Sequence, residues 1–142
     1  RLTFHGSVLI LGGSSELGRA LALALRAEGA QVCCVCRDDA GCARCAQDGL
    51  PALVLGDPET LPARCEALLG RPVGHLADLL HSRFEQLVAM AAPEAIERWA
   101  DDDIALRARC LRAVSRAMLA RRFGRCVFVS SSAAQRPSPG QG

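Results

Sequence analysis

The segment that most constrains the fold is SVLILGGSSELGRALALAL, which runs from Ser7 to Leu25. A short β-rich run at 7–11 meets two glycines and two serines, and a segment with helical spacing follows at 16–28. In a doubly wound fold, the turn after the first strand faces the ligand crevice, where glycines let the backbone approach a phosphate. The helix N-terminus adds free N–H groups and a partial positive charge. The segment therefore predicts a strand, a phosphate-binding turn and a helix.

Strand-like and helix-like segments alternate along the rest of the chain, and the 142 residues are typical of one domain. Further strands are expected at 31–36, 51–55, 75–80 and 125–130, and helices at 39–47, 59–69, 85–99 and 104–122. The segment 75–80 also fits a helix, and 133–142 is a loop by composition. Five alternations favour an α/β fold, with a parallel sheet and helices on both of its faces.

Charge and hydropathy exclude several classes of protein. Seventeen basic and fifteen acidic residues give a formal net charge of +2, without the strong basic excess that is typical of nucleic-acid-binding domains. No apolar run approaches the roughly 18 residues that indicate a membrane span. We therefore expect neither a nucleic-acid partner nor a membrane span.

Eight cysteines raise the question of zinc. Cys33 and Cys36 form one C-x-x-C pair, and Cys42 and Cys45 form another. Only five residues separate the pairs, whereas zinc ribbons usually have roughly 15–20. Buried free cysteine behaves as a small hydrophobe. The spacing therefore favours no metal site and an intracellular, reducing compartment, such as the cytoplasm or the mitochondrial matrix.

The candidate phosphate cradle consists of four residues that follow the first strand. Gly12, Gly13, Ser14 and Ser15 lie between the strand and the helix, which is the context that a phosphate-binding turn requires. Gly18, one turn into the helix, allows close packing of helix and strand.

These residues carry a resemblance to a known family. LGGSSELG resembles the T-G-x-x-x-G-x-G loop of the short-chain dehydrogenases/reductases, with Leu11 in place of the threonine and Glu16 in place of the middle glycine. Leu17 then falls among the cofactor-binding positions. The segment 115–134 is similar to the family's long helix and the I-S-S end of its fifth strand. The likeness is strongest to 3-oxoacyl-carrier-protein reductases and carbonyl reductases.

The resemblance implies a Rossmann-like sheet of about five strands in the order 3-2-1-4-5, as part of an NAD(P)-dependent oxidoreductase. Residues 1–142 would be an incomplete domain that stops before the family's last strands.

The expected cofactor is NADP(H) rather than NAD(H). Arg37 follows the second strand, where an arginine can pair with the 2′-phosphate of NADP. Asp38 is adjacent and could instead bind the ribose of NAD, so both cofactors stay possible. The resemblance further assigns Asp57 to the adenine and His81 to the segment after the fourth strand.

The family's catalytic set resembles Asn-Ser-Tyr-Lys, and most of it has no counterpart here. The serine falls on Ser131, with Ser130 or Ser132 as second choices, and it would only position a substrate. The asparagine falls near Asp103. The chain contains no tyrosine, lysine or asparagine, and the family's tyrosine and lysine would follow Gly142. We therefore expect no carbonyl reduction by these residues alone.

The small residues that follow the family's fourth strand are replaced by bulky ones in this sequence. By the resemblance, Arg83 and Phe84 stand where the family's small side chains make room for the cofactor.

Three readings of the function follow from the sequence. The chain is the cofactor-binding part of a reductase, a non-catalytic subunit or scaffold in a larger assembly, or a nucleotide-binding fold of another kind. The helix at 104–122 and an exposed strand edge at 125–130 are expected to bind a partner, either a second copy or another protein.

Overall fold

A computed structural model describes residues 2–82, 84 and 86–136. Its centre is one parallel sheet with the strand order β3-β2-β1-β4-β5, which confirms the predicted order. The strands are β1 (Ser7–Leu11), β2 (Val32–Cys36), β3 (Ala52–Val54), β4 (Val73–Asp78) and β5 (Arg125–Phe128). The α-helices are α1 (Glu16–Ala27), α2 (Asp39–Gln47), α3 (Leu61–Leu69), α4 (Pro93–Trp99) and α5 (Leu106–Ala120). A π-helical segment (Ala100–Ala105) joins α4 to α5, and short 3₁₀ turns lie at Pro58–Thr60, Val88–Met90 and Ser132–Ala134.

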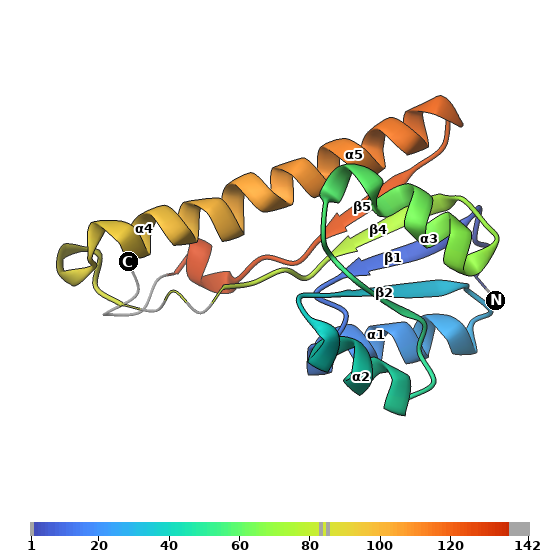
Figure 1. Cartoon of the computed structure of the whole chain (residues 1–142), viewed down its shortest axis with the longest axis horizontal. Helices are drawn as coiled ribbons and strands as arrows, with labels where there is room; N and C mark the ends of the chain where they lie inside the picture. The colour runs from blue at the N-terminus through green and yellow to red at the C-terminus, as the bar shows by residue number, and fades with distance from the viewer. Residues whose placement is uncertain (1, 83, 85, 137–142) are drawn as a thin grey trace.

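Helices cover both faces of the sheet, as the alternation of elements predicts. α3 and α5 pack on one face, and α1 and α2 pack on the other (Figure 1). β2 shows why the strands are continuously apolar: Cys33 and Val35 enter the α3/α5 core, while Cys34 and Cys36 enter the α1/α2 core. A strand buried on both faces cannot alternate polar with apolar residues.

The predicted helices at 85–99 and 104–122 are one continuous helical rod. It begins at Pro93 and runs through the π-helical segment to Ala120, so the expected start at residue 85 is wrong. Proline fits the first turn of a helix and disfavours helix in the residue before it, which explains the start. Glu85 itself lies outside the described residues.

Helical spacing predicts one apolar face for this helix, formed by Ile104, Ala108, Leu111, Val114 and Met118, and this prediction is partly wrong. Val114 and Met118 are buried against the sheet and Leu111 is half-buried, but Ile104 is 56% exposed and Ala108 is exposed. At about 3.6 residues per turn these five positions share one arc of roughly 120°, so the spacing does describe one face. Ile104 is exposed because it lies in the π-helical segment, which extends past the sheet and has no buried residue.

Other predicted boundaries shift by a few residues. β4 spans 73–78, whereas the sequence predicts 75–80. The predicted start is too late because glycine, here Gly74, is a residue type that argues against a strand. A Cβ atom added at Gly74 would lie 1.8 Å from the carbonyl oxygen of His5, so only glycine allows this approach of the backbones. The predicted loop at 133–142 begins instead with the 3₁₀ turn, and 137–142 lie outside the described residues.

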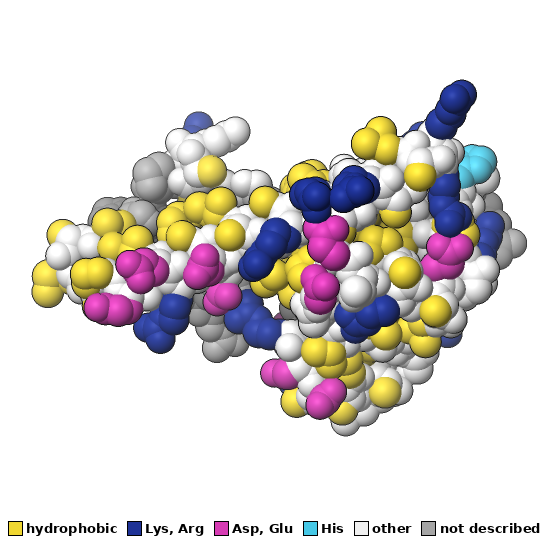
Figure 2. All heavy atoms as spheres, turned by 45° about the horizontal axis from the view of Figure 1, so that its top comes forward, with side chains coloured by type: hydrophobic (Ala, Val, Ile, Leu, Met, Phe, Trp, Pro, Cys, Tyr) yellow, Lys and Arg dark blue, Asp and Glu magenta, His cyan; other side chains and the backbone are white. Residues whose placement is uncertain are grey.

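β5 is the edge strand that the sequence predicts to be exposed. All four of its residues are exposed, and Val127 retains 61% of its accessible surface. α4 and the π-helical segment also contain no buried residue and extend past the sheet as an arm with exposed hydrophobic side chains (Figures 1 and 2).

One histidine of the sheet gives a pH-dependent prediction. The ring of His75 packs edge-on against Phe4 and Phe123, with centroid distances of 5.8 and 5.4 Å. Burial, then the charges of Arg125 and His5, lower the pKa of His75 below its usual 6.5. The unfolded chain therefore binds this proton more tightly, so stability is complete above about pH 6.5 and falls as the pH drops through the folded-state pKa.

We expect chemical denaturation to show this loss as the pH falls below about 6.5. His75→Gln should flatten that part of the curve, whereas His81→Gln, at an exposed position, should leave it unchanged. Parallel curves for the wild type and His75→Gln would contradict the assignment.

Candidate functional site

The carboxyl ends of the five strands gather most of the predicted site residues along one edge of the sheet. Figure 1 shows the strand tips pointing toward the side where α4 extends. Between β1 and β4 the strand order reverses, because β2 and β3 lie on one side and β5 lies on the other. Open α/β sheets bind their ligands in the crevice at such a switch point. The segment after β1 lies at this crevice.

The glycines of this turn are required by close contacts. A Cβ atom at Gly12, whose φ is +75°, would lie 2.9 Å from the carbonyl oxygen of Leu79. At Gly13 it would lie 2.5 Å from the Cβ of Cys34, and at Gly18 it would lie 2.5 Å from the carbonyl oxygen of Gly12. These contacts pack the turn tightly against β2, the segment after β4 and the first turn of α1.

Ser15 caps α1. Its Oγ accepts a hydrogen bond from the N–H of Gly18 at 3.0 Å and donates one to the carbonyl of Gly12 at 2.8 Å. Ser14 is half-buried, whereas Glu16 and Leu17 are exposed in the first helical turn. Glu16 stands where the helix dipole favours an anion, so its carboxylate competes with a bound phosphate for the same positive potential.

Arg37 and Asp38 follow β2 and differ in what their side chains do. The Asp38 carboxylate caps α2 by accepting a hydrogen bond from the N–H of Gly41 at 2.7 Å. The Arg37 side chain is exposed and lines the crevice. Since one carboxylate oxygen of Asp38 already accepts a hydrogen bond from the N-terminus of α2, Arg37 is the better candidate for a cofactor contact.

A small cavity of about 180 Å³ lies at this edge. Its walls come from the ends of β2 and β3, the segment after β4, and the helical rod above them. They are formed by Val35, Cys36, Arg37, Leu55, Leu80, Asp102 and Leu106. Drug-sized ligands occupy roughly 300–1,000 Å³, so this cavity fits one ring of a nucleotide, with the remainder outside it.

Asp57, His81 and Ser131 lie farther along the same edge. Asp57 caps the 3₁₀ turn after β3, accepting a hydrogen bond from the N–H of Glu59 at 3.0 Å. His81 is exposed after β4, and Ser131 after β5 accepts a hydrogen bond from the N–H of Ala133 at 3.1 Å. Asp57 and Ser131 follow opposite edge strands, about 19 Å apart at the usual strand spacing, so they cannot share one ring of a ligand.

The segment after β4 is tied to the helical rod by Ser82. Its N–H donates to the Asp103 carboxylate at 2.9 Å, and its hydroxyl donates to the same group. The ring of Phe84 packs on Trp99 with a centroid distance of 5.7 Å. Arg83 lies outside the described residues. Asp103, expected at the family's asparagine position, therefore serves as an acceptor within a π-helical segment, a feature that is frequent at functional sites.

A buried ion pair at this edge of the sheet was not predicted from the sequence. Asp78, the last residue of β4, is 1% exposed. Its carboxylate accepts hydrogen bonds from Arg107 Nε at 2.8 Å and from the N–H of Leu80 at 3.0 Å. A carboxylate that ends an apolar strand, with an arginine on a later helix, was the available signal.

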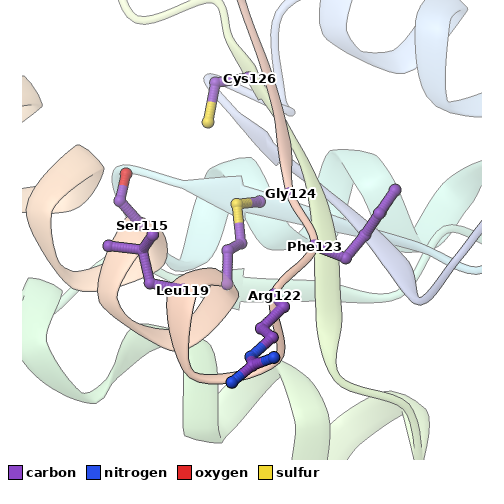
Figure 3. Close-up of a pocket in the computed structure, with 7 residues that line it drawn as sticks. Ser115, Leu119, Arg122, Phe123, Gly124 and Cys126 are labelled. Atoms are coloured by element: carbon purple, nitrogen blue, oxygen red, sulfur yellow. The ribbon is translucent and has the colours of Figure 1, made fainter.

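The larger cavity lies away from the crevice. It has a volume of about 510 Å³ between the end of α5 and β5, and it includes Arg122 and Phe123. Figure 3 shows Ser115 and Leu119 on the α5 side of it and Cys126 on the β5 side. It lies beside the unpaired strand edge, so it belongs to the exposed surface around β5.

Two kinds of feature are absent from the part of the chain that the structure describes. No group of three or more histidine, cysteine, aspartate or glutamate side chains there is arranged to hold a metal ion. No helix within 2–82, 84 and 86–136 has both the length and the apolar character needed to cross a bilayer.

Comparison with solved structures supports the fold. Two solved structures of the TT0495 protein from Thermus thermophilus superpose with TM-scores of 0.80 and 0.79, at 22% and 24% sequence identity. They align with 94% and 95% of this chain, which spans only 56% and 61% of their lengths. No family model and no curated protein matches the sequence.

Proposed function

We propose that this chain is an NADP(H)-binding domain of a short-chain dehydrogenase/reductase-like oxidoreductase. The observation that carries the proposal is the glycine turn at the switch point between β1 and β4, with Arg37 at the mouth of the neighbouring cavity. The pyrophosphate would lie on the turn at Gly13–Ser15 and the N-terminus of α1. The adenine ring would enter the 180 Å³ cavity, between Leu55 and Leu80.

Arg37 would set the preference for NADP(H). Its guanidinium is a bidentate donor suited to the 2′-phosphate, and a hydrogen bond to a charged group contributes roughly 1.5–3 kcal/mol. The Asp38 carboxylate caps α2 and is therefore less available to bind the ribose of NAD(H), which favours NADP(H).

These residues do not supply carbonyl reduction. Ser131 can offer a hydroxyl to a substrate oxygen, but a serine alone is a poor acid or base at neutral pH. The tyrosine and lysine of the family's catalytic set have no counterpart among the 142 residues. A reductase activity of the whole protein, toward a carbonyl or 3-oxoacyl substrate, therefore depends on further residues.

The test is titration of the purified chain with NADPH, followed by calorimetry, with NADH as the comparison. We expect micromolar binding of NADPH, and Arg37→Ala should weaken it by about tenfold while changing NADH binding little, since about 1.4 kcal/mol corresponds to tenfold. Arg44→Ala is the matched control, because Arg44 is an exposed arginine in the last turn of α2. Equal losses for the two variants would contradict a specific role for Arg37.

A second candidate function is that of a non-catalytic subunit or scaffold. The exposed β5 edge and the arm formed by α4 favour it, because such surfaces pair with other chains. This second function predicts a stable homo- or hetero-oligomer in sedimentation equilibrium and no binding of NADPH or NADH.

An intracellular, reducing compartment is part of this proposal. All eight cysteines are free thiols, and Cys126 is exposed on β5. Free thiols persist where glutathione and thioredoxin keep them reduced, as in the cytoplasm or the mitochondrial matrix.

A further inference from the structure

A group of cysteine sulfurs lies directly behind the glycine turn. Cys34 and Cys36 of β2 and Cys45 of α2 share the core between the sheet and the α1/α2 layer. The Sγ atoms of Cys36 and Cys45 are 3.6 Å apart, and both side chains are buried. Since a disulfide holds its sulfurs at about 2.05 Å, an approach of about 1.5 Å separates this thiol pair from a bond.

The same sulfurs touch the backbone of the turn. The S–H of Cys45 donates to the carbonyl oxygen of Gly13, with the two heavy atoms 3.6 Å apart. Gly41, in the first turn of α2, packs between Cys36 and Ser14: a Cβ atom added there would lie 3.0 Å from the Cβ of the first and 3.0 Å from the Oγ of the second. A shift of α2 toward β2 therefore reaches both Gly13 and Ser14.

The sulfur group is closed to large reagents but approaches the surface at one point. Cys42, one turn before Cys45 on α2, is partly exposed and packs against the same core. Burial raises the pKa of Cys34 to about 12 and also raises the pKa of Cys36. Because the thiolate is the reactive form, these thiols react slowly at neutral pH. Burial of Cys36 and Cys45 separately limits the oxidant to one as small as hydrogen peroxide.

We propose that Cys36 and Cys45 are a reversible redox modification site that hydrogen peroxide converts into a disulfide. One sulfur attacks the peroxide oxygen and becomes a sulfenic acid, and the O–O bond breaks to release one water. The second sulfur displaces the sulfenic hydroxyl as another water, forming the S–S bond. The two thiol protons leave in the waters, the sulfurs are oxidised by two electrons, and the peroxide is reduced by two. A dithiol reductant reverses the reaction.

The disulfide is expected to weaken the nucleotide site, a consequence that depends on the function proposed above. Oxidation removes the S–H donor from the Gly13 carbonyl and draws the α2 helix toward β2. Both changes act on the turn from behind, so affinity for NADPH should fall by at least about fivefold, the lower end of usual coupling between two sites.

The first test is a map of the bond in the folded chain. The Cys126→Ser background removes the exposed thiol that could link two molecules. After treatment with hydrogen peroxide, we expect the intact mass to fall by two hydrogen atoms. Trypsin separates the two segments: peptide 27–37 holds Cys33, Cys34 and Cys36, peptide 38–44 holds Cys42, and peptide 45–64 holds Cys45. The expected product links 27–37 to 45–64 and disappears with dithiothreitol.

Single substitutions assign the sulfurs. Cys36→Ala and Cys45→Ala should abolish the linked product, while Cys34→Ala, on the same face of β2, should keep it. Cys110→Ala is a buried control on the other face of the sheet. A product that includes peptide 38–44, or no product in a chain whose circular dichroism is native, would overturn the proposal.

NADPH titration of the reduced and oxidised forms then distinguishes the redox coupling from the proposed NADP(H)-binding function. Weaker binding after oxidation, restored by dithiothreitol, supports the coupling. Equal binding by both forms overturns the coupling. No binding by either form, with the disulfide in place, contradicts the proposed function and leaves the redox site standing.

Discussion

Arg107→Leu is expected to lower the free energy of unfolding by about 3 kcal/mol, the low end of the range for losing one partner of a buried ion pair. The low end applies because Arg107 keeps 27% of its side-chain surface exposed, whereas Asp78 keeps 2%. The substitution leaves the Asp78 carboxylate buried, with the N–H of Leu80 as its remaining donor among the described residues. Urea denaturation followed by circular dichroism measures the loss.

Arg112→Leu is the matched control, because Arg112 lies on the same helix and pairs with Glu59 at the surface. An exposed pair contributes about 0.2–1 kcal/mol, so this variant should be close to wild type. The double variant Asp78→Asn with Arg107→Leu should recover part of the loss, since it removes the uncompensated charge. Similar losses for Arg107→Leu and Arg112→Leu would contradict the importance of burial.

Gly13→Ala should destabilise the fold by about 3 kcal/mol, the upper end of the usual cost of overpacking. The added Cβ would lie 2.5 Å from the Cβ of Cys34 and 2.7 Å from its Cα, and the backbone of a central strand cannot rotate away. The turn must therefore lift off β2, so NADPH binding should be lost at temperatures where the variant remains folded. Thermal denaturation and calorimetric titration test the two effects separately.

Gly70→Ala provides the comparison for this prediction. Unlike Gly13, Gly70 has open space around it, with no atom within 4 Å of an added Cβ, but its φ of +68° strains any other residue. The expected cost is about 1 kcal/mol, from backbone strain alone. NADPH binding should be unaffected, and an equal stability loss for the two variants would show that contact with Cys34 is not the cause.

The individual strands and helices could be predicted because their signals are local, whereas the strand order was predicted from the family resemblance. β1 and β2 are apolar runs bounded by turns, and the segment 39–47 became a helix with the predicted bounds. The glycine turn was predictable too, since its glycines lie between a strand and a helix. These features depend on neighbours within a few positions along the chain.

The errors arose where distant segments meet. Pro93 starts a helix that continues through a π-helical segment. Val114 is buried and Ile104 is exposed because only the C-terminal part of this helical rod packs on the sheet. The crevice cavity was likewise out of reach, because its walls come from residues as far apart as Val35 and Leu106.

By itself, the sequence determined the order of strands and helices, the position of the glycine turn and the absence of tyrosine, lysine and asparagine. Only the tertiary structure decided that Asp78 meets Arg107 and that the sulfur of Cys45 lies behind Gly13. The physical reason is range: helix and strand propensities act over a few residues, whereas ion pairs and sulfur contacts form between segments that the sheet brings together. Such pairs leave no periodic pattern in the chain.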